Sequence, residues 1–492
     1  MTNTDTTAFE HVDDVAEPAA PRVPEPRRRR PKDPCGLVFV ALSLLFGCAF
    51  ALITPPLWGF DEATHFSRAY AVDHGRILPQ LIPGSDVVYG GPIPETVAEL
   101  SHFAANGFNN VPAFPEHGVA HPETYAELLA QPLNAPLVDV GFVNTSSYSP
   151  VAYVPSALAL RAVEVVDGSV GLALTLMRLA DVLAFTGVVW LTLRALRGLR
   201  FRWVVFVVAL MPMTVFVAGM ITADALTNAL SLLFGALFVK AVLLAKRLSR
   251  WETALLFTAA VLLPLAKPTY VLLVLLLPLV PGSRMAARRW AGIAATAAGV
   301  TGFGIWTALS ARTSEGMHVM RPNEVVDPGL QVQYLLTHLT DVPGLLARTF
   351  AAQEQGIVTG FFGVFGSSFV LAPATAGLAT LAAGALAFGI TDRMRATRAQ
   401  WITSAGFVLV SAAALFGTLY LEFSPVGQYQ IEGVQGRYFL PLVVIAVAVL
   451  ARVIPLRLEI PRARLLRGTE VAIVVLVFYA LLSSAFKYEF LL

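Results

Sequence analysis

The sequence predicts an all-α fold, a polytopic bundle of transmembrane helices, from three observations. Apolar residues make up 56% of the 492 residues and charged residues only 14%, against roughly 45–50% and about 25% in soluble domains. Mean hydropathy is +0.66, and several apolar runs reach about 20 residues, the length that crosses a bilayer. Lys and Arg gather in clusters between these runs, as in cytoplasmic loops. A water-soluble fold is therefore excluded.

The first segment, residues 1–34, is polar. It mixes Pro, Ala and acidic residues and ends in Arg27, Arg28, Arg29, Arg30 and Lys32. Because such a composition cannot bury a core, we expect a disordered cytoplasmic tail. A basic block directly before an apolar run is typical of an uncleaved signal anchor. We therefore assign residues 35–492 to one polytopic membrane domain.

Apolar runs along this domain predict about eleven spans, by a window of about 19 residues. They lie near residues 35–57, 170–195, 202–221, 225–245, 252–266, 269–282, 290–309, 369–390, 401–421, 437–454 and 470–487. The runs 252–266 and 269–282 are short, so a single longer span is the alternative. Two crossings put every basic cluster on one side, as the positive-inside rule requires. We therefore predict a hairpin with Lys267 at its outer tip, a cytoplasmic N-terminus and an outer C-terminus.

The segments on the other side predict a large first extracytoplasmic loop, residues 58–169. It is acidic between Trp58 and Pro150, where Arg68 and Arg76 are the only strong bases. Its apolar stretch Val151–Val166 is interrupted by Pro155, Arg161 and Glu164. We expect that stretch to form an interfacial helix. Residues 310–356 form a second outer loop, and 422–436 a third.

The most informative motif follows the first span, where Asp61 and Glu62 stand next to each other. If residues 61–72 are helical, His65 and Arg68 share a face with Asp61. Adjacent carboxylates at a membrane surface suit a general base or a metal ligand. The alternative is that Asp61 only caps the helix. We expect Asp61, or secondarily Glu62, to be catalytic, and His65 and Arg68 to contact substrate.

Other polar residues also fall toward the outer half of the predicted spans. Arg178 and Asp181 are expected to form a buried ion pair, as a helix clamp or a functional group. Asp224 is interpreted as a helix cap. Lys267 and Arg437 place cations where an anionic headgroup could bind. We expect the substrate to be bound, besides His65 and Arg68, by Arg178, Lys267, Tyr270, Arg437 and Tyr438. Snorkelling is the alternative for Lys267.

Several function classes lack their motifs. The sequence contains no P-loop, HExxH, CxxC pair or GxSxG motif, so ATP hydrolysis, a zinc protease of that type and an α/β-hydrolase have no support. The net charge of +2 argues against nucleic acid as a partner. We assign no metal ligands, and the sequence leaves a divalent metal requirement open.

A combination of short motifs is spread over residues 37–485. It consists of Pro55-Pro56, Asp61-Glu62-x-x-His65-Phe66-x-Arg68-Ala69-Tyr70, Tyr148-x-Pro150-x-x-Tyr153, Arg178, Asp224, Lys267-Pro268-x-Tyr270 and Gly436-Arg437-Tyr438-Phe439-x-Pro441. In this combination the chain resembles the predicted bacterial multi-pass membrane proteins grouped as domain of unknown function 2142. The resemblance implies a bacterial plasma-membrane protein and carries no mechanism.

In layout, the chain is more remotely similar to the GT-C superfamily of glycosyltransferases, which have an acidic pair soon after the first span. That similarity implies a GT-C-like fold and an inverting glycosyltransferase. Its donor is a lipid-linked sugar phosphate, a polyprenyl-phosphate sugar, and its acceptor a cell-envelope glycan on the outer face. Besides membrane lipids, these are the expected partners. Two alternatives remain: a transporter or flippase of a lipid-linked glycan or small anion, and a non-catalytic envelope-assembly scaffold.

Overall fold

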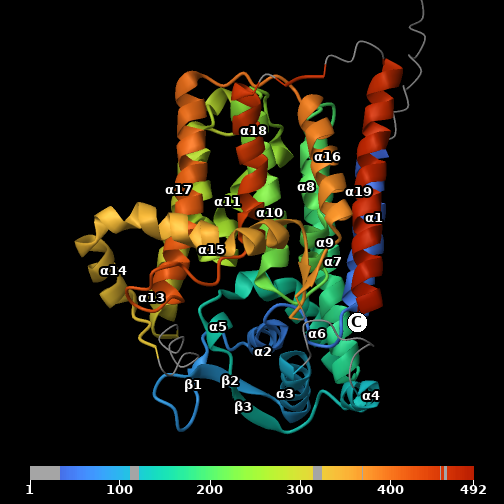
Figure 1. The fold of residues 1–492 in the computed structure, drawn as a ribbon, viewed down its shortest axis with the longest axis vertical. Helices are drawn as coiled ribbons and strands as arrows, with labels where there is room; N and C mark the ends of the chain where they lie inside the picture. The colour runs from blue at the N-terminus through green and yellow to red at the C-terminus, as the bar shows by residue number, and fades with distance from the viewer. Residues whose placement is uncertain are drawn as a thin grey trace, which may run out of the picture.

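The computed structural model describes residues 34–110, 121–313, 324–367, 369–454, 456–458 and 463–491. The predicted tail, residues 1–34, lies outside this part of the chain except for Pro34. Helices dominate the described residues and stand side by side in an upright bundle, and a three-stranded sheet lies at one end (Figure 1). We call the end of the bundle that carries strands β1–β3 the loop end.

Seven helical segments of the described chain are long and apolar enough to cross a membrane. Their helices are α1 (Pro34–Ile53), α7 (Val170–Ala195), α10 (Ala223–Phe238) with the π-turn η2 (Val239–Leu243), α13 (Arg289–Ser310), α17 (Arg398–Glu422), η8 (Gly436–Leu442) with α18 (Val443–Val453), and α19 (Ala463–Leu491). The multi-pass architecture is thereby confirmed. The count of eleven spans stays a prediction.

The four remaining expected spans are shorter or broken. They are α8 (Arg202–Ala209) with α9 (Pro212–Ala218), α11 (Arg250–Ala266), the pieces η3 (Pro268–Tyr270), α12 (Val271–Val274) and η4 (Leu277–Leu279), and α16 (Ala374–Gly389). Proline lacks an N–H and clashes with the preceding turn, so a helix breaks at it. Pro212 begins α9 and Pro268 begins η3. The Thr214 hydroxyl donates to the Val208 carbonyl at 3.0 Å across the first break, which satisfies a carbonyl freed inside the bundle.

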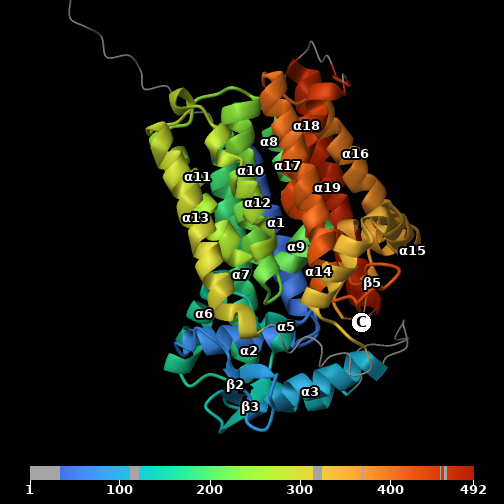
Figure 2. The same cartoon turned by 90° about the vertical axis from the view of Figure 1, so that its left-hand side faces the viewer.

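The segment 250–284 forms a hairpin. The Leu248 N–H, before α11, donates to the carbonyl of Arg284 in η5 (Gly282–Arg284) at 2.8 Å. Both ends of the hairpin therefore lie together, and Lys267 lies at the turn. The same end holds further basic connections, since the Arg395 N–H donates to the Leu243 carbonyl at 2.6 Å. We call this the basic end, and it is opposite the loop end (Figure 2).

The two helices nearest the chain ends run in the same direction. The rings of Phe46 and Phe478 lie 5.7 Å apart, and those of Phe50 and Tyr488 lie 6.1 Å apart. Helix α1 thus begins at the basic end, and α19 ends at the loop end, where Figure 1 marks the C-terminus. This arrangement agrees with an odd number of crossings between them.

The first loop contains strands, so the all-α expectation is incomplete. Strands β1 (Gln80–Leu81), β2 (Tyr89–Pro94) and β3 (Leu137–Gly141) form an antiparallel sheet in that order. The loop also contains α2 (Glu62–Asp73), α3 (Glu95–Asn110), α4 (Pro122–Ala130), α5 (Val143–Ser146), η1 (Pro150–Tyr153) and α6 (Val154–Val165). Helix α6 covers the predicted interfacial stretch, packs against α7 and α2, and exposes Leu158 and Val165.

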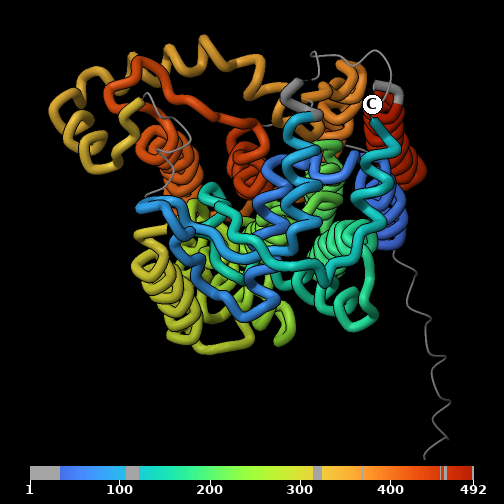
Figure 3. Tube along the Cα trace, turned by 90° about the horizontal axis from the view of Figure 1, so that it is seen from below, coloured from blue at the N-terminus to red at the C-terminus, as the bar shows by residue number. Residues whose placement is uncertain are grey.

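The second loop crosses the edge of the bundle near the loop end. It contains α14 (Pro328–Thr337), η7 (Leu339–Asp341), α15 (Val342–Phe362) and the hairpin β4 (Val364–Phe365) and β5 (Val370–Leu371). Figure 3 shows α14 and α15 arching past the upright helices. A Cβ on Gly436 would lie 2.0 Å from the Ile357 carbonyl oxygen. Glycine is therefore required where α15 crosses η8, directly before Arg437.

Candidate functional site

Three charged side chains from distant parts of the sequence meet near the loop end. Asp224 lies in the first turn of α10, Lys267 at the turn of the 250–284 hairpin, and Arg437 in η8. The Lys267 Nζ is 2.5 Å from Asp224 Oδ1, and the Arg437 Nε is 3.5 Å from Asp224 Oδ2. Lys267 and Arg437 are buried, at 8% and 7% exposed. We call these three residues the charge cluster.

Aromatic rings surround the two cations. The Arg437 guanidinium carbon lies 3.8 Å from the centroid of the Phe60 ring and 5.3 Å from that of Tyr438. The Lys267 Nζ lies 4.8 Å from the Tyr438 centroid and 6.0 Å from that of Tyr148. Ring faces attract cations electrostatically. They therefore hold the cations in place without accepting their hydrogen bonds.

Arg437 has spare hydrogen-bonding capacity. Its buried Nε forms no hydrogen bond in the described structure. Its ion pair with Asp224, at 3.5 Å, is longer than a hydrogen bond. A guanidinium carries five N–H donors, and a buried donor without a partner is costly. With Lys267 and Arg437 against one carboxylate, the charge cluster has a net charge of +1. Both properties suit an anionic ligand.

Asp61 lies next to the charge cluster, and its carboxylate does not cap helix α2. It precedes α2 with φ of 52° and ψ of 22°, and its side chain makes no capping hydrogen bond. Its side chain is exposed, and the preceding residue is the Phe60 that stacks on Arg437. The left-handed conformation is uncommon for any residue except glycine, although Asp tolerates it. The alternative of a side-chain cap is therefore not what the structure shows.

Glu62 has a different environment, because it is fully engaged in a buried clamp. Arg178 contacts it through Nε to Oε1 at 2.7 Å and Nη2 to Oε2 at 2.5 Å. The backbone N–H groups of Gly59 and Ile221 donate to the same carboxylate at 3.0 and 3.1 Å. The remaining Arg178 donors bond to the carbonyls at the end of α1: Ala51, Thr54 and Pro55. This clamp joins α1, α2, α7 and the start of α10.

The expected ion pair between Arg178 and Asp181 is therefore wrong. Asp181 instead accepts a hydrogen bond from the Ser156 hydroxyl of α6 at 2.8 Å. Arg178 and Asp181 are both on α7, but Arg178 pairs with Glu62 of α2 and Asp181 bonds to Ser156 of α6. Residue spacing along one helix gave no information on Glu62, which is the carboxylate that Arg178 reaches.

His65 links the first loop to the charge cluster. Its Nδ1 is 2.7 Å from the Tyr153 hydroxyl, and its ring stacks with that of Tyr148 at 5.9 Å between centroids. Burial lowers the pKa of His65 to about 4, although the carboxylates of Asp61 and Asp224 act in the opposite direction. The imidazole is thus neutral near pH 7. Burial also raises the pKa of Tyr148 to about 12, so its hydroxyl remains a donor.

The other two expected substrate ligands bond to the protein itself. Arg68 is fully buried and donates to the carbonyls of Arg76, Ile77 and Tyr148, which fixes the path of the first loop. The Tyr270 hydroxyl donates to the Tyr438 carbonyl at 2.8 Å. Arg68 and Tyr270 thus hold the backbone around the site in place. Of the expected residues, Asp61, His65, Lys267, Arg437 and Tyr438 are the ones at or beside the charge cluster.

Sequence reasoning missed Asp224 as a site residue and gave it only a capping role. The actual N-cap of α10 is Thr222, whose hydroxyl accepts the Asp224 N–H at 3.3 Å. The available signal was that Lys267 and Arg437 were both expected at the outer side without a carboxylate to pair with. Phe60, Tyr148 and Tyr153 were also missed, because aromatic residues near membranes are too common to single out.

A second group in the first loop could hold a metal by its geometry. Among the described residues, ligand atoms of Asp73, His74 and Glu164 lie within 4.8 Å of one another. Arg161 already pairs with Asp73 at 3.1 Å and with Glu164 at 3.4 Å. This group lies at the far end of α2 from Asp61 and is separate from the charge cluster.

Comparison with known proteins places the chain in a family without naming an activity. No curated protein matches the sequence. The model of one family, described as "Predicted membrane protein (DUF2142)", matches residues 44–446. That range includes the charge cluster, Asp61 and the Glu62–Arg178 clamp. The chain therefore belongs to the DUF2142 family of predicted membrane proteins.

Proposed function

We propose that this protein is a membrane-embedded inverting glycosyltransferase. It transfers a sugar from a polyprenyl-phosphate donor to a hydroxyl of a cell-envelope acceptor at the loop end, on the outer face of a bacterial plasma membrane. The observation that carries this proposal is the charge cluster beside an exposed, uncapped Asp61.

The cations of the charge cluster provide the donor site. A phosphate diester can accept hydrogen bonds from the unused N–H groups of Arg437. The guanidinium is planar and suited to two parallel hydrogen bonds. Lys267 adds a second positive charge. Asp224 contacts both cations and so holds them in place before substrate binds. The aromatic rings of Phe60 and Tyr438 keep both cations in a partly dry environment, which strengthens their interaction with charge.

Asp61 provides the base. Its carboxylate takes the proton of the acceptor hydroxyl as that oxygen attacks the anomeric carbon from the face opposite the phosphate. A bond forms between the acceptor oxygen and the anomeric carbon, and the bond from that carbon to the phosphate oxygen breaks. The polyprenyl phosphate leaves with the bonding electron pair, and Lys267 and Arg437 stabilise its added charge. The anomeric configuration is inverted.

Glu62 is assigned to the frame of this site. Both of its oxygens accept hydrogen bonds from Arg178 or from backbone N–H groups. It fixes the start of α2 and so the position of Asp61. His65, neutral and hydrogen-bonded to Tyr153, lies one helical turn after Asp61. We assign its other ring nitrogen to one hydrogen bond with a sugar hydroxyl.

The test is sugar transfer from a labelled polyprenyl-phosphate donor by the full chain, purified and reconstituted in liposomes. Asp61→Asn keeps the size of the side chain and removes its basicity, so turnover should fall by about a hundredfold or more while donor binding persists. Asp139→Asn is the matched control, because Asp139 is an exposed carboxylate in β3 of the same loop.

Full transfer by Asp61→Asn would overturn the assignment of the base. A wild-type protein that moves the labelled lipid across the bilayer without forming a glycosylated product would favour the transporter or flippase. If the protein shows neither sugar transfer nor lipid movement and co-purifies with envelope proteins, the scaffold is favoured.

A further inference from the structure

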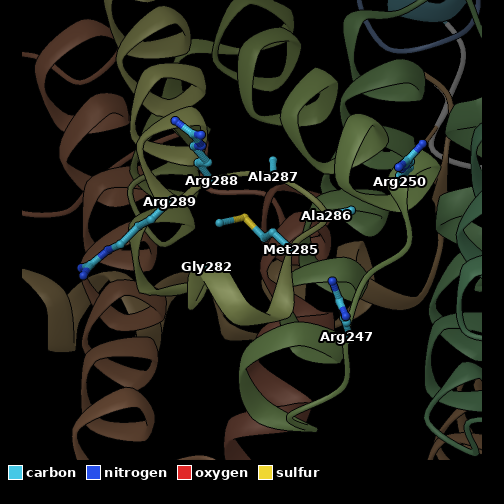
Figure 4. A pocket seen from close by; sticks show the side chains of 8 residues that line it. All are labelled: Arg247, Arg250, Gly282, Met285, Ala286, Ala287, Arg288 and Arg289. Atoms are coloured by element: carbon cyan, nitrogen blue, oxygen red, sulfur yellow. The ribbon is translucent and has the colours of Figure 1, made fainter.

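A cavity opens at the basic end, far from the charge cluster. Its volume is about 630 Å³, and it lies between the connection from α10 to α11 and the connection from η5 to α13. Figure 4 shows the residues that line it. They are Arg247, Arg250, Gly282, Met285, Ala286, Ala287, Arg288 and Arg289.

The lining of this cavity has one sign of charge. Four of its eight residues are arginines, and none is acidic. In Figure 4 Arg288 and Arg250 lie on opposite sides of Met285, Arg247 lies below Arg250, and Arg289 extends away to the left. The nearest carboxylate in sequence, Glu252, is occupied by Lys240 at 2.7 Å and by the Ser249 N–H at 2.9 Å. It therefore does not neutralise the arginines.

Unused donors add to the attraction for an anion. Arg284, whose carbonyl fastens the two connections together, has a buried Nη1 without a hydrogen bond in the described structure. The 22-residue helix α13 begins at Arg289, and its N-cap side chain makes no capping bond. The first N–H groups of a helix and its dipole favour negative charge. Arg284 lies four residues before Arg288 on the same connection, and α13 begins directly after Arg288.

Two tryptophans place the cavity at the depth of lipid headgroups. Trp251 follows Arg250 and Trp290 follows Arg289, and their side chains are 40% and 64% exposed. Exposed tryptophan is typical of the membrane–water interface. A phosphate-bearing anion in this cavity would therefore belong to the headgroup layer of the adjacent leaflet.

We propose that the cavity binds the phosphate groups of an anionic lipid headgroup in the leaflet at the basic end. Because arginines from two separate connections line the cavity, a diphosphatidyl headgroup, which carries two phosphates, fits the site best. Basic pockets between transmembrane helices are suited to such headgroups. The bound lipid would join the start of α11 to the start of α13. This site is independent of the proposed transferase site, which lies at the opposite end.

The experiment uses the full chain in nanodiscs of zwitterionic lipid, titrated with diphosphatidylglycerol and followed by native mass spectrometry. The test variant is the double substitution Arg247→Gln and Arg288→Gln. The matched control is Arg452→Gln and Arg464→Gln, which removes two exposed charges at the end of α18 and the start of α19. A juxtamembrane basic residue contributes about 1 kcal/mol to binding anionic lipid. The test variant should therefore bind about tenfold to thirtyfold more weakly, whereas the control should bind like wild type.

A second arm separates a lipid from a soluble anion. Inorganic pyrophosphate at millimolar concentration should neither bind nor displace the lipid. If pyrophosphate binds as tightly as the lipid, the site takes a soluble anion and the lipid assignment is wrong. If both double variants lose affinity equally, the general positive charge of the basic end attracts the lipid, and the cavity has no specific role. Because the readout is retained lipid, transferase activity does not affect the result.

Discussion

The Arg437 guanidinium carbon lies 3.8 Å from the centroid of the Phe60 ring, and Phe60 is the residue directly before Asp61. One stacked pair thus couples η8, which supplies a cation of the charge cluster, to the start of α2, where the proposed base lies. Because the stack leaves the edge of the guanidinium free, it orients the donors of Arg437 without using them.

Phe60→Leu should weaken donor binding more than it slows chemistry. The substitution retains an apolar side chain and removes the ring face, a loss of about 0.5–2 kcal/mol for a partly dry cation. KM for the polyprenyl-phosphate donor should therefore rise roughly twofold to thirtyfold, with kcat little changed. Steady-state transfer kinetics measure both. Phe103→Leu removes a ring of the same loop that packs on Tyr125, and it should leave KM unchanged.

Lys267→Ala should impair binding and turnover together. Its ammonium group is proposed to contact the phosphate both in the bound donor and as the phosphate leaves. Removal of one preorganised donor lowers rates by about a hundredfold or more, so kcat/KM should fall by at least that factor. Lys246→Ala removes an exposed lysine at the basic end and serves as the control. Equal kcat/KM in the two variants would contradict a phosphate role for Lys267.

The sequence predicted the membrane class, the position of most helices and that Lys267 and Arg437 lie at the end of the bundle opposite the basic clusters. Those features depend on local apolar length and on charge, which are visible in a short window. It also predicts that Lys267 and Arg437 bind an anionic headgroup, and this stays a prediction. It did not identify Asp224 as their partner, because the pairs that form join residues 43 and 213 positions apart, from separate helices.

The Glu62–Arg178 clamp shows the same limit. Arg178 and Asp181 are three residues apart, and local spacing favoured their pairing. In the structure the chain turns back after α1, and the start of α2 lies against α7. Arg178 therefore pairs with Glu62 and not with Asp181. The carbonyls of Ala51, Thr54 and Pro55, left without helical partners at the end of α1, add three more acceptors. Such a site depends on the path of the loop, which no local pattern encodes.

Glu62→Gln should destabilise the fold strongly. It leaves Arg178 buried without its counterion, and loss of one partner of a buried pair costs about 3–5 kcal/mol. The apparent melting temperature of the purified protein in detergent should fall by several degrees or more. Glu123→Gln, at a carboxylate that is 67% exposed, should leave it unchanged. Wild-type melting with loss of transfer would instead indicate a direct chemical role for Glu62.

The orientation of the bundle can be tested by cysteine accessibility. The positive-inside rule places the basic end in the cytoplasm and the loop end outside. In a background without Cys35 and Cys48, Asp139→Cys should react with a membrane-impermeant maleimide in intact cells. Arg289→Cys should react only after the cells are opened. The opposite pattern would place the charge cluster in the cytoplasm and remove the basis for an envelope acceptor.

Acidification should destabilise the protein through His65. Its pKa is about 4 in the folded state, because burial disfavours the charged form, and 6.5 is its ordinary value. The unfolded chain therefore binds more protons between these values, so the free energy of unfolding is unaffected above about pH 7 and falls as the pH drops below 6.5. For this one group the loss between pH 7.5 and pH 5 is on the order of 2 kcal/mol. Melting of His65→Gln over that range should therefore depend less on pH than melting of wild type. His121→Gln, at a histidine that is 70% exposed, should keep the wild-type slope; if His65→Gln also keeps it, His65 is not the group that titrates.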